Sequence, residues 1–185
     1  MNAETDFFRA PPPQATLILG GARSGKSALA EKLARNGGGA LVYIATAEAH
    51  DGEMRERIAR HRAERGSDWE TIEAPLALPE ALAAVAADRP EATVVIDCLT
   101  LWLSNLILAD RDWAAAADRF CEQLSGLSAR IICVSNEVGL GIVPDTPLGR
   151  VFRDAQGRLN QRVAAVADAV VFVAAGLPLM LKAPR

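Results

Sequence analysis

The chain has 185 residues, half of them apolar, and a formal net charge of −3. This size fits one domain with a substantial core better than two domains. The negative charge and the absence of a long basic run disfavour nucleic acid or an anionic membrane as the partner, and no apolar stretch reaches transmembrane length. Residues 1–14 hold three successive prolines and lack a signal-peptide pattern, so we expect a disordered leader before a single catalytic domain over 15–185.

Short apolar runs alternate with longer helical patterns along the chain, which is typical of a parallel sheet covered by helices on both faces. The expected strands, in chain order, are Thr16–Leu19, Leu41–Ala45, Trp69–Glu73, Thr93–Asp97, Ile131–Ser135, Ala169–Ala174 and Pro178–Lys182. The expected helices lie near 26–35, 51–65, 78–87, 99–108, 113–127 and 148–167. Trp69–Glu73 is the more polar candidate, and Pro178–Lys182 is short enough to lie at an edge of the sheet.

A phosphate-binding motif stands between the first expected strand and the first expected helix, which is the context that a P-loop requires. Its glycines let backbone N–H groups turn toward phosphate oxygens, and the helix N-terminus adds partial positive charge. We expect Lys26 to reach the β- and γ-phosphates and the Ser27 hydroxyl to bind Mg²⁺. The alternative is a chance glycine-rich turn. The complete motif consists of Gly20, Gly21, Ala22, Arg23, Ser24, Gly25, Lys26 and Ser27.

The strand Thr93–Asp97 ends in a carboxylate, as the second motif of P-loop proteins does, and Asp97 is therefore a candidate Mg²⁺ ligand. The alternative is that Asp97 caps the following helix. The two motifs together predict an α/β fold of the P-loop NTPase type (RecA-like), a mostly parallel sheet with helices on both faces and room for one short antiparallel edge strand. The Asn-Lys-x-Asp segment of guanine-specific switch GTPases is missing, which leaves a kinase or a nucleotidyltransferase.

The histidine in the expected helix 51–65 has two interpretations. Met54, Ile58 and His61 share one face of this helix, which fits a half-buried structural histidine. Arginines surround His61, which would suit triphosphate oxygens, and a neutral imidazole is a competent nucleophile at phosphorus. The arginines themselves also fit a solvated helix face.

The cysteines, Cys98, Cys121 and Cys133, are far apart and have no metal-ligand spacing. We expect reduced structural thiols, which are typical of a cytoplasmic protein.

Several motifs together resemble one enzyme family. They are the phosphate loop, Tyr43–Thr46, Asp51–Arg62, Trp69–Glu73, Asn136–Pro144 and Phe152–Gln161. From about residue 16 to about residue 180 the chain is similar to the bifunctional adenosylcobinamide kinase/adenosylcobinamide-phosphate guanylyltransferases of cobalamin biosynthesis. The resemblance implies that ATP or GTP phosphorylates adenosylcobinamide, that GTP guanylylates a histidine, and that GMP then passes to adenosylcobinamide phosphate.

The resemblance also implies site residues and an assembly. His61 matches the guanylylated histidine, and Lys26 serves both steps. The contacts expected for GTP, with Mg²⁺ bound, are the phosphate loop 20–27 and then Ala45, Thr46, Ala47, Arg62, Ala63, Glu64, Arg65, Glu73 and Asp97. The family pattern implies a homotrimer in the cytoplasm.

Other residues and functions stay open at this point. Glu137 can approach a substrate hydroxyl or Mg²⁺, or its glycine-rich segment can serve only as a tight turn. Arg153, Asp154 and Asn160 can bind the corrinoid, contact a neighbouring subunit or lie on a solvated helix face. The alternative functions are a P-loop kinase with a single activity and a regulatory nucleotide-binding module.

Overall fold

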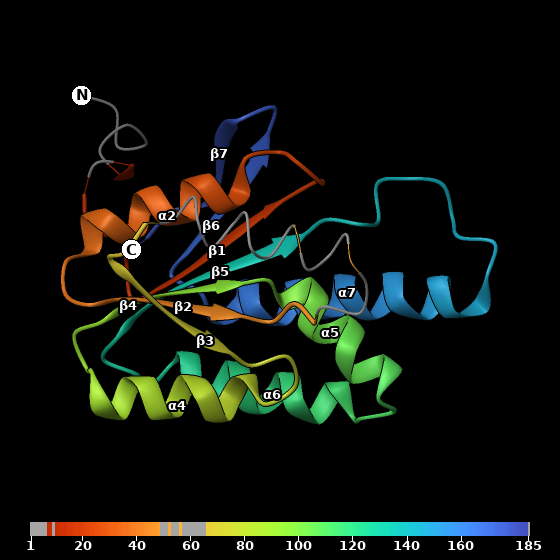
Figure 1. Cartoon of the computed structure of the whole chain (residues 1–185). Coiled ribbons are helices and arrows are strands. Elements are labelled where there is room, and N and C mark those ends of the chain that lie inside the picture. The colour runs from red at the N-terminus through yellow and green to blue at the C-terminus, as the bar shows by residue number, and fades with distance from the viewer. Residues whose placement is uncertain (1–6, 9, 49–51, 53–55, 57–65, 185) are drawn as a thin grey trace.

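A computed structural model describes residues 7–8, 10–48, 52, 56 and 66–184. The described residues form a seven-stranded sheet in the order β3-β2-β4-β5-β1-β6-β7 (Figure 1). Its strands are β1 (Ala15–Gly20), β2 (Leu41–Ala45), β3 (Trp69–Glu73), β4 (Thr93–Asp97), β5 (Arg130–Asn136), β6 (Ala169–Ala174) and β7 (Leu177–Lys182). Neighbouring strands are parallel, except that β7 pairs antiparallel with β6 at the edge. This arrangement confirms the predicted fold class.

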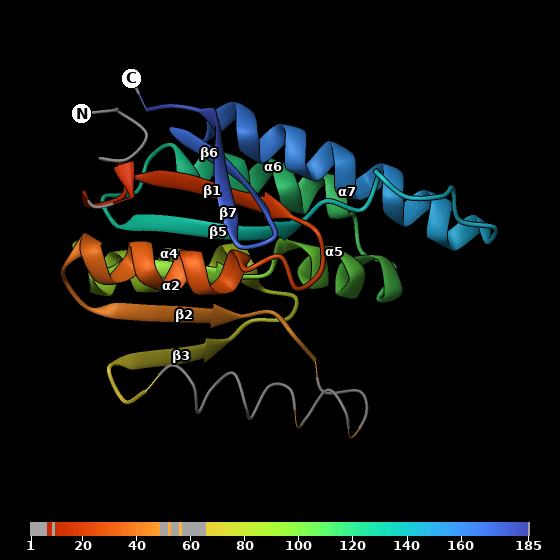
Figure 2. The same cartoon turned by 90° about the horizontal axis from the view of Figure 1, so that it is seen from above.

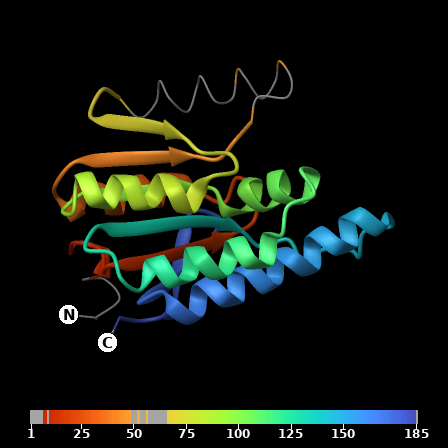
Figure 3. The same cartoon turned by 90° about the horizontal axis from the view of Figure 1, so that it is seen from below.

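The helices cover both faces of the sheet. They are α2 (Lys26–Gly37), α4 (Leu78–Asp88), α5 (Leu99–Leu108), α6 (Trp113–Leu124) and α7 (Pro147–Val166). Helix α2 lies on one face, seen in front in Figure 2, and the other four lie on the opposite face, seen in front in Figure 3. The helix expected at 51–65 falls almost entirely outside the described residues.

Burial on both faces explains the apolar strands. Leu17 and Ile18 are neighbours in β1 and point to opposite faces, yet both are fully buried, each in a different hydrophobic cluster. Leu17 packs beneath the four helices, and Ile18 packs beneath α2. A central strand between two helix layers therefore needs apolar residues on both of its faces.

Helix α7 has a fixed start and a fixed end. Thr146 precedes it and accepts a hydrogen bond from the backbone N–H of Gly149, and Pro147 takes the first turn. At the other end, the Lys182 ammonium from β7 donates to the carbonyl oxygens of Ala164 and Ala165 at 3.1 Å. A cation among the last carbonyls of a helix stabilises its negative end.

The N-terminal segment differs from the expected disordered leader at two positions. Phe7 is buried in the cluster beneath α2, and the Phe8 carbonyl accepts a hydrogen bond from the Asn36 side chain at 3.3 Å. Burying an aromatic ring offsets the entropy lost by ordering the chain, and the proline run gave no sign of this. Within the described ranges, no helix combines the length and apolarity needed to cross a membrane.

Candidate nucleotide site

The phosphate loop connects β1 to α2 at the carboxyl edge of the sheet. Gly25 has φ 100° and Gly20 has φ 154°, and a Cβ atom on Gly20 would lie 2.3 Å from the carbonyl oxygen of Val173. Only glycine fits at Gly20, because neither the backbone angle nor the space accepts a side chain. Arg23, at the exposed tip, is also left-handed with φ 54°. The sequence motif has therefore folded into the loop that it predicts.

Two neighbouring segments hold this loop from either side. The Gly176 N–H, in the β6–β7 turn, donates to the Ser24 carbonyl at 2.9 Å. The Glu137 N–H, just after β5, donates to the Gly20 carbonyl at 3.1 Å. In the sequence, the first of these segments is visible only as an Ala-Gly pair between two expected strands. Its hydrogen bond to the phosphate loop joins distant parts of the chain, which no local sequence pattern predicts.

Lys26 lies buried under the loop. Its ammonium donates to the Gly21 carbonyl and makes a longer contact of 3.5 Å to the Ser24 hydroxyl. Burial lowers the pKa of Lys26, and the nearby Asp97 carboxylate partly opposes that shift. An incompletely solvated cation at a helix N-terminus is a receptor for phosphate oxygens.

Asp97 ends β4 and faces the same side of the sheet as the loop. Its Oδ2 accepts a hydrogen bond from the Tyr43 hydroxyl at 2.9 Å. The residue at the start of α5 is Cys98, and no side-chain capping bond forms there, so the alternative role of Asp97 as a helix cap is wrong. Ser27, in the first turn of α2, is partly exposed.

These side chains fit Mg²⁺ only together with a nucleotide. Among the described residues, no group of three or more His, Cys, Asp or Glu side chains gathers to hold a metal by itself. Mg²⁺ in nucleotide enzymes is held by one or two protein oxygens, phosphate oxygens and waters. A hydroxyl and one carboxylate beside a phosphate loop are the donors that such a site requires.

Three of the predicted contacts meet at the ends of neighbouring strands. Ala45 is paired in register with Glu73 on one side and with Asp97 on the other. Glu73 is exposed, and Ala45 and Ala47 are partly buried. The predicted residues His61, Arg62, Ala63, Glu64 and Arg65 lie outside the described residues.

Thr46 has a role inside the protein that the sequence did not predict. Its hydroxyl donates to the Cys98 carbonyl at 2.7 Å and accepts from the Cys98 N–H at 2.8 Å. Its carbonyl accepts from the Asn105 side chain, and its own N–H donates to the Asp97 carbonyl. Thr46 therefore ties β2 to the turn that carries Asp97, and its contact with nucleotide stays a prediction.

The structure shows the surroundings of the C-terminal residues whose roles the sequence left open. Asn160 is buried, accepts from Ser135 at 2.7 Å and donates to the Asn136 carbonyl at 3.0 Å. This position excludes a solvated or corrinoid-facing Asn160, because its amide is consumed in anchoring α7 to β5. Arg153 and Asp154 form a surface ion pair, and the Glu137 carboxylate accepts from the Gly139 N–H.

The three cysteines are free and buried, as expected. Burial, and to a smaller degree the nearby Asp97 carboxylate, raises the pKa of the Cys98 thiol to about 12, which favours the neutral thiol.

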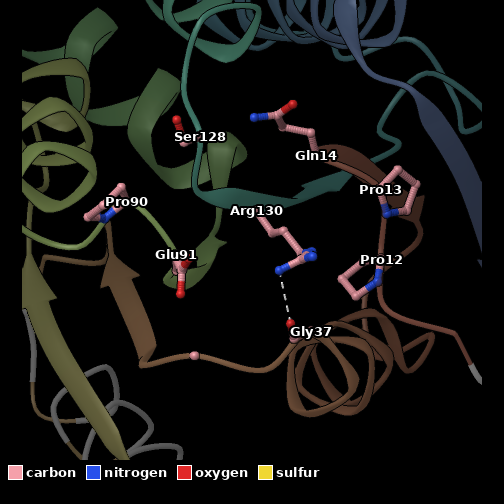
Figure 4. A pocket seen from close by; sticks show the side chains of 9 residues that line it. Pro12, Pro13, Gln14, Gly37, Pro90, Glu91, Ser128 and Arg130 are labelled. Carbon is pink, nitrogen blue, oxygen red and sulfur yellow. Dashed lines mark hydrogen bonds between the residues drawn. The ribbon is translucent and has the colours of Figure 1, made fainter.

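Cavities among the described residues also lie away from the phosphate loop. One of about 310 Å³ lies between α5 and the start of α7 and is lined by Ile107, Leu148 and Phe152 among others. The larger one, of about 830 Å³, is at the amino edge of the sheet, where Arg130 donates to the Gly37 carbonyl (Figure 4). No predicted site residue lines the larger cavity, and its edge is opposite the one where ligands of parallel α/β sheets bind.

The fold and the phosphate loop define an α/β protein of the P-loop type. A model of the CobU family, described as cobinamide kinase / cobinamide phosphate guanyltransferase, matches residues 16–181, and the chain belongs to this family. The bifunctional adenosylcobalamin biosynthesis protein CobP of Pseudomonas aeruginosa is 52% identical over 169 residues, covering 90% of this chain and 96% of the relative. CobU of Salmonella typhimurium, a protein with the same descriptive name, is 38% identical over 181 residues, covering 90% and 98%.

Family membership gives the chain the kinase and guanylyltransferase activities of cobalamin biosynthesis and disfavours the two alternative functions. Among solved structures, the flagellar accessory protein FlaH of Methanocaldococcus jannaschii has a TM-score of 0.56 at 13% identity, covering 100% of this chain and 86% of that one. This likeness concerns the fold alone.

Proposed function

We propose that the enzyme phosphorylates adenosylcobinamide with ATP or GTP and then transfers GMP from GTP to adenosylcobinamide phosphate through a guanylyl-His61 intermediate. The observation that carries the proposal is one edge of the sheet that holds the phosphate loop, buried Lys26 and Asp97 together. Both reactions break a phosphoanhydride bond of a bound nucleoside triphosphate, so one phosphate site can serve both.

In the kinase step, the hydroxyl of the aminopropanol arm attacks the γ-phosphorus, and the nucleoside diphosphate leaves. The backbone N–H groups of the loop and Lys26 orient the triphosphate and neutralise the charge that develops on it. Ser27 and Asp97 would hold Mg²⁺, which would further neutralise the charge of the phosphates.

In the transfer step, an imidazole nitrogen of His61 attacks the α-phosphorus of GTP, and pyrophosphate leaves. A phosphate oxygen of adenosylcobinamide phosphate then attacks the same phosphorus, forms the new anhydride and releases the imidazole. The guanine and triphosphate contacts proposed for this step come from Arg62–Arg65, Glu73 and Ala45–Ala47.

We also propose that the enzyme is a cytoplasmic homotrimer. Free buried thiols favour a reducing compartment. Exposed apolar side chains on the β5–α7 loop favour self-association, since Leu140 is 82% exposed and Ile142 is 98% exposed. Light scattering of the purified protein measures the assembled mass directly.

The covalent intermediate gives the sharpest test of this proposal. Incubation with GTP and Mg²⁺ is expected to add one GMP unit per chain, which intact mass spectrometry detects, and the bond is acid-labile as expected for a phosphoramidate. His61→Ala removes the adduct and the transferase activity and keeps kinase activity, because the γ-phosphoryl group passes directly to the substrate. His50→Ala, the matched control, keeps the adduct. A full adduct on His61→Ala would place the nucleophile elsewhere.

A further inference from the structure

The position of Tyr43 in β2 explains how its ring reaches the nucleotide site. Tyr43 is paired in register with Val95 of β4, and Asp97 lies two residues further along on the same face. The tyrosine is only 4% exposed and belongs to the cluster beneath α2. Its ring runs toward the carboxyl edge, where the hydroxyl meets Asp97 Oδ2 at 2.9 Å.

The ring of Tyr43 is held in place by its neighbours. Trp69 of β3 packs edge-on against it, with centroids 6.1 Å apart and an interplanar angle of 86°. Arg35 of α2 covers the Trp69 ring at 5.8 Å. A buried ring fixed on its side cannot change rotamer cheaply, so the hydroxyl is preorganised.

The hydrogen bond selects one orientation of the Asp97 carboxylate. Oδ2 accepts from the tyrosine, and within the described part of the chain no hydrogen bond to Oδ1 is seen. The donor is a neutral phenol, so it orients the carboxylate without cancelling its charge, as an arginine would. The full negative charge stays available to a cation on the phosphate-loop side, where Lys26 already responds to it.

We propose that Tyr43 is a positioning residue: by donating to Oδ2, its hydroxyl fixes the Asp97 carboxylate in one orientation for binding Mg²⁺ together with a nucleotide. The inference rests on the proposed role of Asp97 in binding Mg²⁺. Outer partners of metal-binding groups commonly change metal affinity by about 10- to 100-fold when removed, because they fix the orientation of the ligand. Tyr43 carries this role from the middle of a strand, at a position that otherwise belongs to the core.

The test is Tyr43→Phe, which keeps the ring and its contact with Trp69 and removes only the hydroxyl. Mn²⁺ serves as the probe, and its binding to the enzyme in the presence of a non-hydrolysable GTP analogue is followed by electron paramagnetic resonance. We expect Mn²⁺ affinity to fall about 10-fold, with the affinity for the analogue without metal unchanged. In kinase assays, the Mg²⁺ concentration for half-maximal rate rises, and kcat at saturating Mg²⁺ stays close to that of the unsubstituted enzyme.

Two control variants separate the possible failures. Asp97→Asn is expected to lose more metal affinity than Tyr43→Phe, because it removes the ligand charge itself. If Asp97→Asn weakens Mn²⁺ binding and Tyr43→Phe does not, the positioning role is overturned and the proposed function stands. If neither variant changes Mn²⁺ binding, the assignment of Asp97 to the metal fails and the role of Tyr43 falls with it. Trp69→Phe leaves the hydroxyl in place and is expected to weaken Mn²⁺ binding less than Tyr43→Phe.

Discussion

The phosphate loop and the β5–α7 loop leave the same edge of the sheet, each from a central strand into a helix, and they are built on opposite principles. The phosphate loop presents its backbone, and left-handed residues and two outside hydrogen bonds fix that backbone. The β5–α7 loop is anchored at its start, where Asn160 of α7 donates to the Asn136 carbonyl, and at its end by the Thr146 cap. Between these anchors it exposes apolar side chains such as Ile142. Substitutions in the first loop should therefore act through conformation, and those in the second through surface chemistry.

Adding one methyl group to each loop gives the largest expected contrast. Gly20→Ala places a Cβ 2.3 Å from the Val173 carbonyl, so the loop must move. We expect nucleotide binding and both activities to fall by about 100-fold or more. Gly141→Ala, in the other loop, meets no atom within 4 Å and should leave both unchanged. Calorimetric titration with GTP, after circular dichroism has verified folding, measures the difference; normal binding by Gly20→Ala would contradict the backbone account.

The charge of Lys26 sharpens the comparison of the two loops. The phosphate loop offers mainly backbone N–H groups to its ligand, and Lys26 adds a charged side chain to them. Lys26→Ala should lower both activities by about 100-fold. Because burial lowers the pKa of Lys26, this residue loses its proton at a lower pH than an exposed lysine, and the affinity for nucleotide should begin to fall at a correspondingly lower pH.

The pH experiment uses ATP, because guanine itself loses a proton in the alkaline range. Lys26→Arg should flatten the pH dependence, since a guanidinium stays charged. An identical decline in that variant would mean that another group titrates.

The anchor of the second loop gives the smallest of these effects. Asn160→Ala removes the side-chain donor to the Asn136 carbonyl and the acceptor of the Ser135 hydroxyl, and it should reduce the free energy of unfolding by about 1–3 kcal/mol. Urea denaturation measures this loss, with Arg158→Ala, an exposed position on the same helix, as the control. Kinase activity of the folded Asn160→Ala fraction should persist, and its complete loss would give Asn160 a role in binding.

The sequence predicted the strands and helices that depend on local patterns. The bounds of Leu41–Ala45 and Thr93–Asp97 are confirmed, because buried parallel strands are continuous apolar runs between clear breaks. The helix expected at 113–127 ends earlier, at Leu124, where the Gly126 N–H turns back to the Gln123 carbonyl.

Local patterns could not predict the hydrogen bonds that side chains make inside the site. Tyr43 and Asp97 are 54 positions apart, and Thr46 and Cys98 are 52 apart. Only the pairing of β2 with β4 brings them together, and a single sequence does not give the order of strands in a sheet. The motif thus identified the phosphate loop. The tertiary structure identified the residues that hold this loop and the Asp97 carboxylate.

The hydrogen bond from Gly176 to Ser24 joins two segments that the ribosome synthesises at different times. The phosphate loop leaves the ribosome well before its neighbours β5 and β6 and the turn that holds it. Strand β1 cannot be enclosed until β5 and β6 have been synthesised, so its apolar side chains stay exposed during that part of translation. Contacts of such long sequence separation fold slowly and favour aggregation while they are incomplete. A nascent chain of this enzyme that stalls before β6 would carry the nucleotide motif without the site.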